Sequence, residues 1–300
     1  MGILDLIAHM EAVPTSFSLA QLTRSASRGG VDAAVQRGSI VRVLPDRYAA
    51  ALHADSWAVR SHAAAMWGPA GCALTGTGVL FDARLLPSPP DHVHLLVPHW
   101  RHRPSPSWVL VTSSTYRPPL LVIRGDGATV VDPALALIHA HGFAPERHRA
   151  ELVYGLTRSG AVEPDAVRAH LERLPRVRGR AALLRRCALA ADGVESYLEE
   201  RGAEQVLVGP GFESIVRQHR VRVSAGRFRL DAYDPITRTA FEFDGAVAHD
   251  GSASRLRDIR RDAALTAAGI VTVRFGYADV TERPEWCREI ALATLASRSS

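Results

Sequence analysis

Three carboxylates stand close together between Arg229 and Gly245, on two short runs of alternating residues. Asp231 belongs to the first run, and Glu242 and Asp244 belong to the second. Carboxylate oxygens are the ligands that Mg²⁺ and Mn²⁺ prefer in proteins. If the two runs pair as strands, the spacing therefore indicates a divalent-metal site.

The spacing predicts that these acids share a hairpin whose turn lies at Asp234-Pro235. Proline sets φ for the first central position of a turn, and the residues on both sides alternate with period two. A loop centred after Ile236 pairs residues whose numbers add to 473. This register places Asp231 opposite Glu242. It also predicts one apolar face, formed by Leu230, Ala232, Phe241 and Phe243.

The opposed acids have two interpretations. Directly opposed residues have Cβ atoms about 4.5–5.5 Å apart, where like charges destabilise a sheet unless a cation lies between them. A bound Mg²⁺ resolves that conflict. In the alternative, the hairpin is an ordinary surface element whose acids are neutralised by arginine, with Arg229 facing Asp244.

The residues after the hairpin predict a crossover helix and a further strand. Positions 252–268 carry apolar residues at helical spacing and end at Gly269, and Ile270–Phe275 has the composition of a buried strand. A strand, a helix and a strand in this order form a βαβ unit. We therefore expect an α/β fold in which the hairpin continues into a mixed sheet.

This segment resembles the PD-(D/E)xK nuclease superfamily, and within it the small nuclease-like domain related to very-short-patch-repair endonucleases. The resemblance covers about residues 190–295. It rests on acids, basic residues and glycines that match the superfamily's pattern, namely Asp231, the run Glu242-Phe-Asp244-Gly245, His249, the helix with Asp258, Arg261 and Asp262, and Val273-Arg274-Phe275. It implies a restriction-endonuclease-like mixed sheet flanked by helices.

The resemblance also implies metal-dependent hydrolysis of phosphodiester bonds. A Mg²⁺ or Mn²⁺ ion, which lowers the pKa of a bound water, would be held by the carboxylates of Asp231, Glu242, Asp244 and Glu195. His249 would assist proton transfer. Arg257 or Arg261 would contact the scissile phosphate, although an exposed helix face with ion pairs is the simpler interpretation for either arginine.

The chain contains no lysine, because all 36 residues counted as Lys or Arg are arginine. The catalytic lysine of the superfamily's pattern is therefore missing, and Asp244 stands at its position. Arginine is a poor substitute because its pKa is too high for it to give up a proton. A second function stays open as a result, that of a non-catalytic DNA-binding regulator whose nuclease-like domain is degenerate.

The first 55 residues predict a winged helix-turn-helix. Short helices are expected at 4–10, 19–25 and 31–37, with a break at Gly29-Gly30, and residues 39–49 predict a two-stranded wing. This region resembles the amino-terminal domain of type IV (AbiEi) abortive-infection antitoxins, which are transcriptional autorepressors. It would bind DNA through Gln36, Arg37, Arg42 and Arg47.

Winged helices also serve as protein-docking modules, which is the alternative to DNA contact. For either role, a cognate toxin or a repair protein is a candidate partner. The net charge of +5 is compatible with a polyanion such as DNA. The sequence does not indicate an oligomeric state.

Length and composition predict about two domains with proper cores, since the 300-residue chain is 47% hydrophobic. We divide it into the winged helix (1–55), an α+β antitoxin-like region (56–145), a helical linker (146–190) and the nuclease-like domain (191–300). Three separated cysteines indicate no disulfide framework. No apolar run approaches the length of a membrane span, so we expect a cytoplasmic protein without membrane contact.

Two further groups of residues have weaker interpretations. The closely spaced histidines favour an interface or surface role over a zinc site, because no cysteine or clear fourth ligand accompanies them; they are His92, His94, His99 and His102. The arginine-rich run from 173 to 186 is expected within the helical linker, where it could also lie against phosphates.

Overall fold

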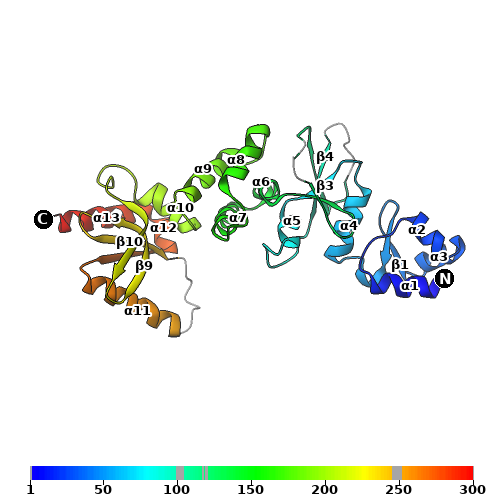
Figure 1. Ribbon diagram of the computed structural model, residues 1–300, viewed down its shortest axis with the longest axis horizontal. Coiled ribbons are helices and arrows are strands. Elements are labelled where there is room, and N and C mark those ends of the chain that lie inside the picture. Colours follow the sequence, from blue (N-terminus) through cyan, green and yellow to red (C-terminus); the bar gives the residue numbers. More distant parts are fainter. Residues whose placement is uncertain (1, 99–104, 117, 119–120, 245–251, 300) are drawn as a thin grey trace. The chain divides into compact units, whose positions relative to one another are not determined.

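The computed structural model describes residues 2–98, 105–116, 118, 121–244 and 252–299 (Figure 1). The chain forms two compact units, the first from residues 1–144 and 161–180 and the second from 145–160 and 181–300. Both units combine helices with a mixed sheet, so the expected α/β class is confirmed. The segment 146–190 is helical, as predicted, and is divided between the two units. Within the described residues, no helix has the length and apolar character needed to cross a bilayer.

The first unit begins with three helices and a two-stranded hairpin, in the order that the sequence predicts. The elements are α1 (Ile3–Ala12), α2 (Leu19–Ser25), α3 (Arg28–Gln36), β1 (Ile40–Leu44) and β2 (Arg47–Ala50). Their shared core contains Leu6, Met10, Leu22, Val31, Ala34, Ile40 and Ala50. Ser18 caps α2 as expected, because its hydroxyl accepts a hydrogen bond from the Gln21 N–H.

The predicted break at Gly29-Gly30 is wrong. Ser27 caps α3 by accepting a hydrogen bond from the Gly30 N–H, so both glycines lie in the first turn of the helix. The helix therefore starts three residues earlier than predicted. It ends as expected before Gly38, whose φ of 77° suits a residue without a side chain.

A mixed five-stranded sheet follows, in the order β5-β4-β3-β7-β6. Its strands are β3 (Ala73–Thr75), β4 (Val93–Pro98), β5 (Val109–Ser114), β6 (Leu121–Ile123) and β7 (Thr129–Val131). The helices of this region are α4 (Trp57–Trp67), α5 (Thr77–Asp82), α6 (Pro133–Phe143) and α8 (Pro164–Arg173). Asp132 caps α6, as the Asp-Pro start predicts, by accepting hydrogen bonds from two backbone N–H groups.

The histidines near β4 do not behave as one group. His94 is buried inside the sheet, where its Nε2 lies 2.7 Å from the Thr112 hydroxyl. Burial, together with neighbouring His139, lowers the pKa of His94 to about 3, so this ring is neutral. The expected interface or surface role is therefore wrong for His94. His92 is exposed, and His99 and His102 fall outside the described residues.

The second unit is built on a four-stranded sheet in the order β11-β10-β9-β8. Its strands are β8 (Val216–Val223), β9 (Gly226–Asp234), β10 (Thr239–Asp244) and β11 (Val271–Gly276). Its helices are α7 (Glu146–Arg158), α9 (Arg180–Ala191), α10 (Tyr197–Arg201), α11 (Ser252–Ala267), α12 (Tyr277–Glu282) and α13 (Pro284–Arg298). β10 and β11 are parallel and joined through α11, which confirms the predicted βαβ unit.

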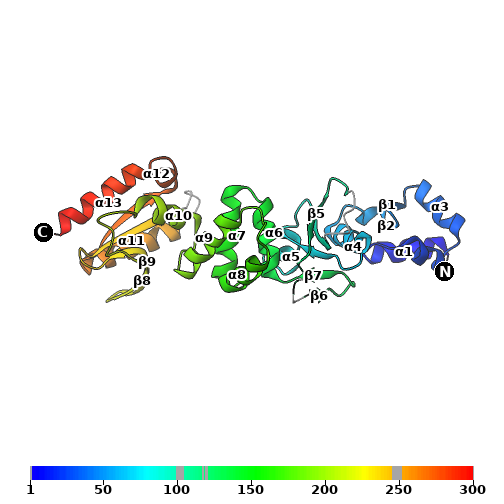
Figure 2. The same cartoon turned by 90° about the horizontal axis from the view of Figure 1, so that it is seen from above.

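The two faces of this sheet are covered by different helices (Figure 1). Leu265 of α11 packs on one face with Leu230 and Ala240. Helices α10, α12 and α13 cover the other face, whose core contains Phe241, Phe243, Phe275, Val280, Cys287 and Ala291. The sheet is therefore buried from both sides near β10, and β8 forms its outer edge (Figure 2).

The predicted register of the hairpin is confirmed, because Asp234 pairs with Thr239 and Ala232 pairs with Phe241. The predicted single apolar face is only partly correct. Ala232 lies in the core under α13, whereas Leu230 lies in the core under α11.

The change of face occurs at Asp231, opposite an irregular residue of β8. On β8, Gln218 lies between the partners of Leu230 and Ala232 and adopts a left-handed φ of 51°. Alternation along a strand requires regular pleating, so an irregular residue opposite Asp231 reverses which side chains point to each face.

The arginine-rich helical run contains a buried ion-pair network. Arg186 is 1% exposed; its Nε donates to Glu200 Oε2 at 2.9 Å, and its Nη2 donates to Glu146 Oε1. The Tyr154 hydroxyl donates to the same Glu200 oxygen at 3.0 Å. Arg186 is therefore engaged inside the second unit, and the idea that it lies against phosphates is wrong.

Candidate functional site

The predicted carboxylates lie where β9 and β10 separate. Regular pairing ends at Ala232 and Phe241, and beyond it the Phe243 N–H donates to Asp231 Oδ2 at 3.0 Å. The carboxylate of Asp231 thus takes the place of a backbone acceptor. Because the side chain reaches across to β10, it also comes close to Glu242.

Glu242 is the most perturbed acid of the site. It is 7% exposed, and burial, reinforced by the negative charge of Asp231, raises its pKa to about 7. Arg261 of α11 opposes this shift, because its Nη2 donates to Glu242 Oε1 at 2.7 Å. The same nitrogen donates to the Arg229 carbonyl at 2.7 Å, which fixes the guanidinium over both strands.

Burial also raises the pKa of Asp231, although the Phe243 N–H and the charges of Arg261 and Arg229 act in the opposite direction. Asp231 and Glu242 therefore resist carrying two negative charges together. The unfavourable interaction between like charges is the property that we expected from the spacing of Asp231 and Glu242.

Glu199 on α10 is a third acid near this site, and the sequence did not single it out. Burial raises its pKa, and the charges of Asp231 and Glu195 add to the effect. Its Oε2 accepts hydrogen bonds from the Glu195 N–H at 2.9 Å and from Gln218 Nε2 at 2.7 Å. The sequence feature that could have identified Glu199 is its position four residues after Glu195, in the first turn of the helix that Ser196 caps.

Two of the predicted acids make ion pairs instead of joining Asp231. Glu195 binds Arg229 through both carboxylate oxygens, so Arg229 does not pair with Asp244 as proposed. Asp244 lies 3.8 Å from Arg274, which also donates to Asp262 at 2.7 Å. The reason is the separation of β9 from β10 at Asp231, which leaves the end of β10 beside β11 only.

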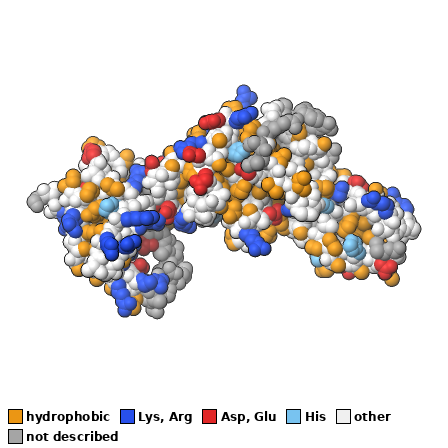
Figure 3. All heavy atoms as spheres, viewed as in Figure 1, with side chains coloured by type: hydrophobic (Ala, Val, Ile, Leu, Met, Phe, Trp, Pro, Cys, Tyr) orange, Lys and Arg blue, Asp and Glu red, His pale blue; other side chains and the backbone are white. Residues whose placement is uncertain are grey.

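The remaining predicted residues are placed as follows. His249 falls outside the described residues, and Arg257 is exposed on α11. In the first unit, Gln36, Arg37 and Arg42 are exposed and Arg47 is half-buried. Figure 3 shows basic side chains on the visible face of both units, so exposure alone does not identify a nucleic-acid contact.

The pair Asp231 and Glu242 has a donor set that fits a hard divalent cation. Each carboxylate has one oxygen engaged, and no described residue donates a hydrogen bond to Asp231 Oδ1 or Glu242 Oε2. Mg²⁺ is commonly held by one or two carboxylates and retains several waters. Within the described part of the chain, no group of three Asp, Glu, His or Cys side chains is arranged to hold a metal ion.

Space beside these acids is limited. A cavity of about 10 Å³ touches Asp231, Glu199 and Phe243, which is about the smallest volume that holds one water.

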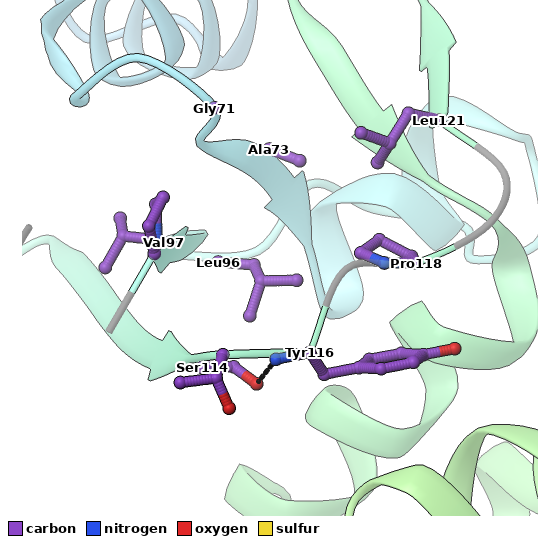
Figure 4. Close-up of a pocket in the computed structure, with 10 residues that line it drawn as sticks. Gly71, Ala73, Leu96, Val97, Ser114, Tyr116, Pro118 and Leu121 are labelled. Carbon is purple, nitrogen blue, oxygen red and sulfur yellow. Dashed lines mark hydrogen bonds between the residues drawn. The ribbon is translucent and has the colours of Figure 1, made fainter. Parts of the chain in front are cut away.

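A larger hollow of about 350 Å³ lies in the first unit, between the ends of β3, β4, β5 and β6. Figure 4 shows Leu96, Pro118, Leu121 and the ring of Tyr116 around it. The Tyr116 hydroxyl bonds to His170 Nδ1 at 2.8 Å. Its described lining residues are mainly apolar and include no acid, so on these residues the hollow does not compete with the carboxylates as a hydrolytic site.

Comparison with known proteins does not identify a family for this chain. Neither the models of protein families nor the curated protein sequences give a significant match to this chain.

Proposed function

We propose that this chain binds DNA and that its second unit hydrolyses phosphodiester bonds with the help of Mg²⁺ or Mn²⁺. The observation that supports the proposal best is that half-buried Asp231 and buried Glu242 lie beside each other where β9 and β10 separate. Each keeps one carboxylate oxygen without a hydrogen bond from a described residue. A site of this kind favours a cation, because the pKa of each acid is raised and two neighbouring carboxylates that both carry a charge repel each other.

The roles follow from the contacts. Asp231 Oδ1 and Glu242 Oε2 would hold the cation, and the Phe243 N–H would keep the Asp231 carboxylate oriented. A divalent cation in this position would supply charge stabilisation and a water of lowered pKa. Arg261 would hold Glu242 in place.

The second candidate function is a DNA-binding regulator without catalysis. The ion pair between Arg261 and Glu242 favours it, since arginine already compensates one of the acids at 2.7 Å. The absence of lysine from the chain favours it too.

Incubation of supercoiled plasmid with the full chain and Mg²⁺ or Mn²⁺ separates the two functions. Under the hydrolytic proposal, the wild type nicks or linearises the plasmid, and Asp231→Ala and Glu242→Ala do not. Glu289→Gln, which changes an exposed acid of α13, is the matched control and should retain activity. If the wild type leaves the plasmid as intact as Asp231→Ala does with both metals, the hydrolytic proposal fails and the regulator remains.

A further inference from the structure

The hairpin formed by β8 and β9 places four arginines directly opposite one another. Arg220 pairs with Arg229, and Arg222 pairs with Arg227. Directly opposed residues of antiparallel strands point to the same side of the sheet, so the four guanidinium groups share one face. All four side chains are exposed.

The other face of the hairpin fixes this arrangement. Val221 and Phe228 pack against the core that contains Leu230 and Leu265. A shift of the register by one residue would expose these apolar side chains, so the strands cannot slip to separate the arginines. Like charges directly opposite each other destabilise a strand pair. The hairpin therefore carries a repulsion that its own packing does not relieve.

Nearby acids compensate only part of this charge. Arg229 binds Glu195, whereas Arg220, Arg222 and Arg227 form no ion pair with any residue in the described part of the chain. A shallow hollow of about 560 Å³ lies among these arginines and Phe228. In Figure 2, β8 lies at the edge of the second unit.

We propose that this face, the arginine hairpin (Arg220, Arg222, Arg227 and Arg229), binds the phosphodiester backbone of a nucleic acid. The inference rests on the proposed function in one respect, that the second unit acts on nucleic acid. The inference also identifies the surface of the second unit that would bind the nucleic-acid strand. Arg229 stands two residues before Asp231 on β9, so a backbone along the hairpin leads to the carboxylates.

The chemistry and the spacing both suit phosphates. A guanidinium group presents a planar fork that binds two oxygens of one phosphate. Positions two residues apart on a strand lie about 6.7 Å apart, which matches the axial rise of about two nucleotides in a duplex strand. The two arginine pairs are therefore far enough apart to contact two different phosphates of one strand.

The test measures binding without hydrolysis. Fluorescence anisotropy with labelled duplex DNA in EDTA would compare full-length proteins that all carry Arg37→Ala and Arg42→Ala, which removes the proposed contacts of the first unit. In this background, Arg220→Ala with Arg222→Ala should raise Kd at least tenfold. It should also reduce the slope of log Kd against log salt by about 2, at about 0.9 for each lost phosphate contact.

Two matched pairs of substitutions test whether the change in DNA binding is specific to the arginine hairpin. Arg158→Ala with Arg283→Ala removes the same charge from exposed positions of the second unit and should leave the slope unchanged. Arg220→Lys with Arg222→Lys keeps the charge and should keep most of the slope. Single-stranded DNA and duplex RNA, measured in the same way, identify which backbone is preferred.

Two results would overturn the inference. In the first, Arg220→Ala with Arg222→Ala binds DNA with an unchanged salt slope, which would leave the arginines only as protection of an edge strand. In the second, polyglutamate displaces DNA as well as unlabelled DNA does at equal charge, which would make the face a general polyanion or acidic-protein site. The plasmid assay is independent of both, so failure of binding and failure of hydrolysis are distinguishable.

Discussion

Replacing Glu242 with glutamine removes the charge that the buried site resists while it preserves the shape of the side chain. The pKa of Glu242 is about 7 in the folded protein and 4.5 in an unfolded chain. Between these values the folded protein retains a proton that the unfolded chain has released, so stability falls as the pH rises through this window. Above pH 7 the loss is complete, and a shift of this size corresponds to about 3 kcal/mol.

Glu242→Gln should therefore stabilise β10 at pH 8 by up to about 3 kcal/mol and at pH 5 by less than about 1 kcal/mol. Hydrogen exchange of the β10 amides in EDTA measures the local free energy of opening. Comparing the variant with the wild type at the same pH removes the intrinsic pH dependence of exchange. Glu289→Gln is the control and should change neither value. Equal stability at pH 8, or a loss in Glu242→Gln, would refute the reasoning, because the ion pair with Arg261 would then outweigh the cost of burial.

Three further outcomes are expected. Arg186→Ala leaves buried Glu200, among the described residues, in an ion pair only with half-exposed Arg185 at 3.2 Å. It should cost about 3 kcal/mol in thermal unfolding, and a loss under 1 kcal/mol would contradict the buried network. Gly202→Ala should cost about 1–3 kcal/mol in the same assay, because an added Cβ would lie 2.3 Å from the Phe243 ring. Arg37→Ala with Arg42→Ala should weaken retardation of DNA in a gel, and unchanged retardation would exclude the proposed contacts of the first unit.

Much of the second unit was predictable, because its signals are local. The alternation on both sides of Asp234-Pro235 gave the hairpin register, and helical spacing followed by Gly269 gave the βαβ unit. The three helices and hairpin of the first unit were predictable for the same reason. The largest difference was the start of α3, since a capping serine outweighs the low helix propensity of two glycines in the first turn.

The site itself was harder to predict, because it depends on an irregularity. Gln218 of β8, which lies opposite Asp231, has a left-handed backbone, and no period-two pattern reveals such a residue. Leu230 and Ala232, on the two sides of Asp231, lie in different cores. The Asp231 carboxylate accepts the Phe243 N–H, a contact that sequence spacing does not reveal either.

The second source of error in the sequence predictions was the choice of ion-pair partners for long side chains. Arg229 reaches Glu195 and Arg261 reaches Glu242, and both distances depend on how helices cross the sheet. Arg186 follows the same rule, since its burial depends on acids 14 and 40 residues away. Sequence spacing identifies which arginines are present, whereas tertiary packing decides which acids they bind.

Calorimetric titration of Mn²⁺ into the full chain at pH 7.5 tests the central claim most directly, namely that Asp231 and Glu242 hold a divalent cation. The wild type should bind Mn²⁺ and Asp231→Asn should not. Asp231→Asn should also be more stable than the wild type in EDTA, since it relieves the repulsion between the acids. Absence of binding by the wild type, or binding that Asp231→Asn leaves unchanged, would contradict the claim.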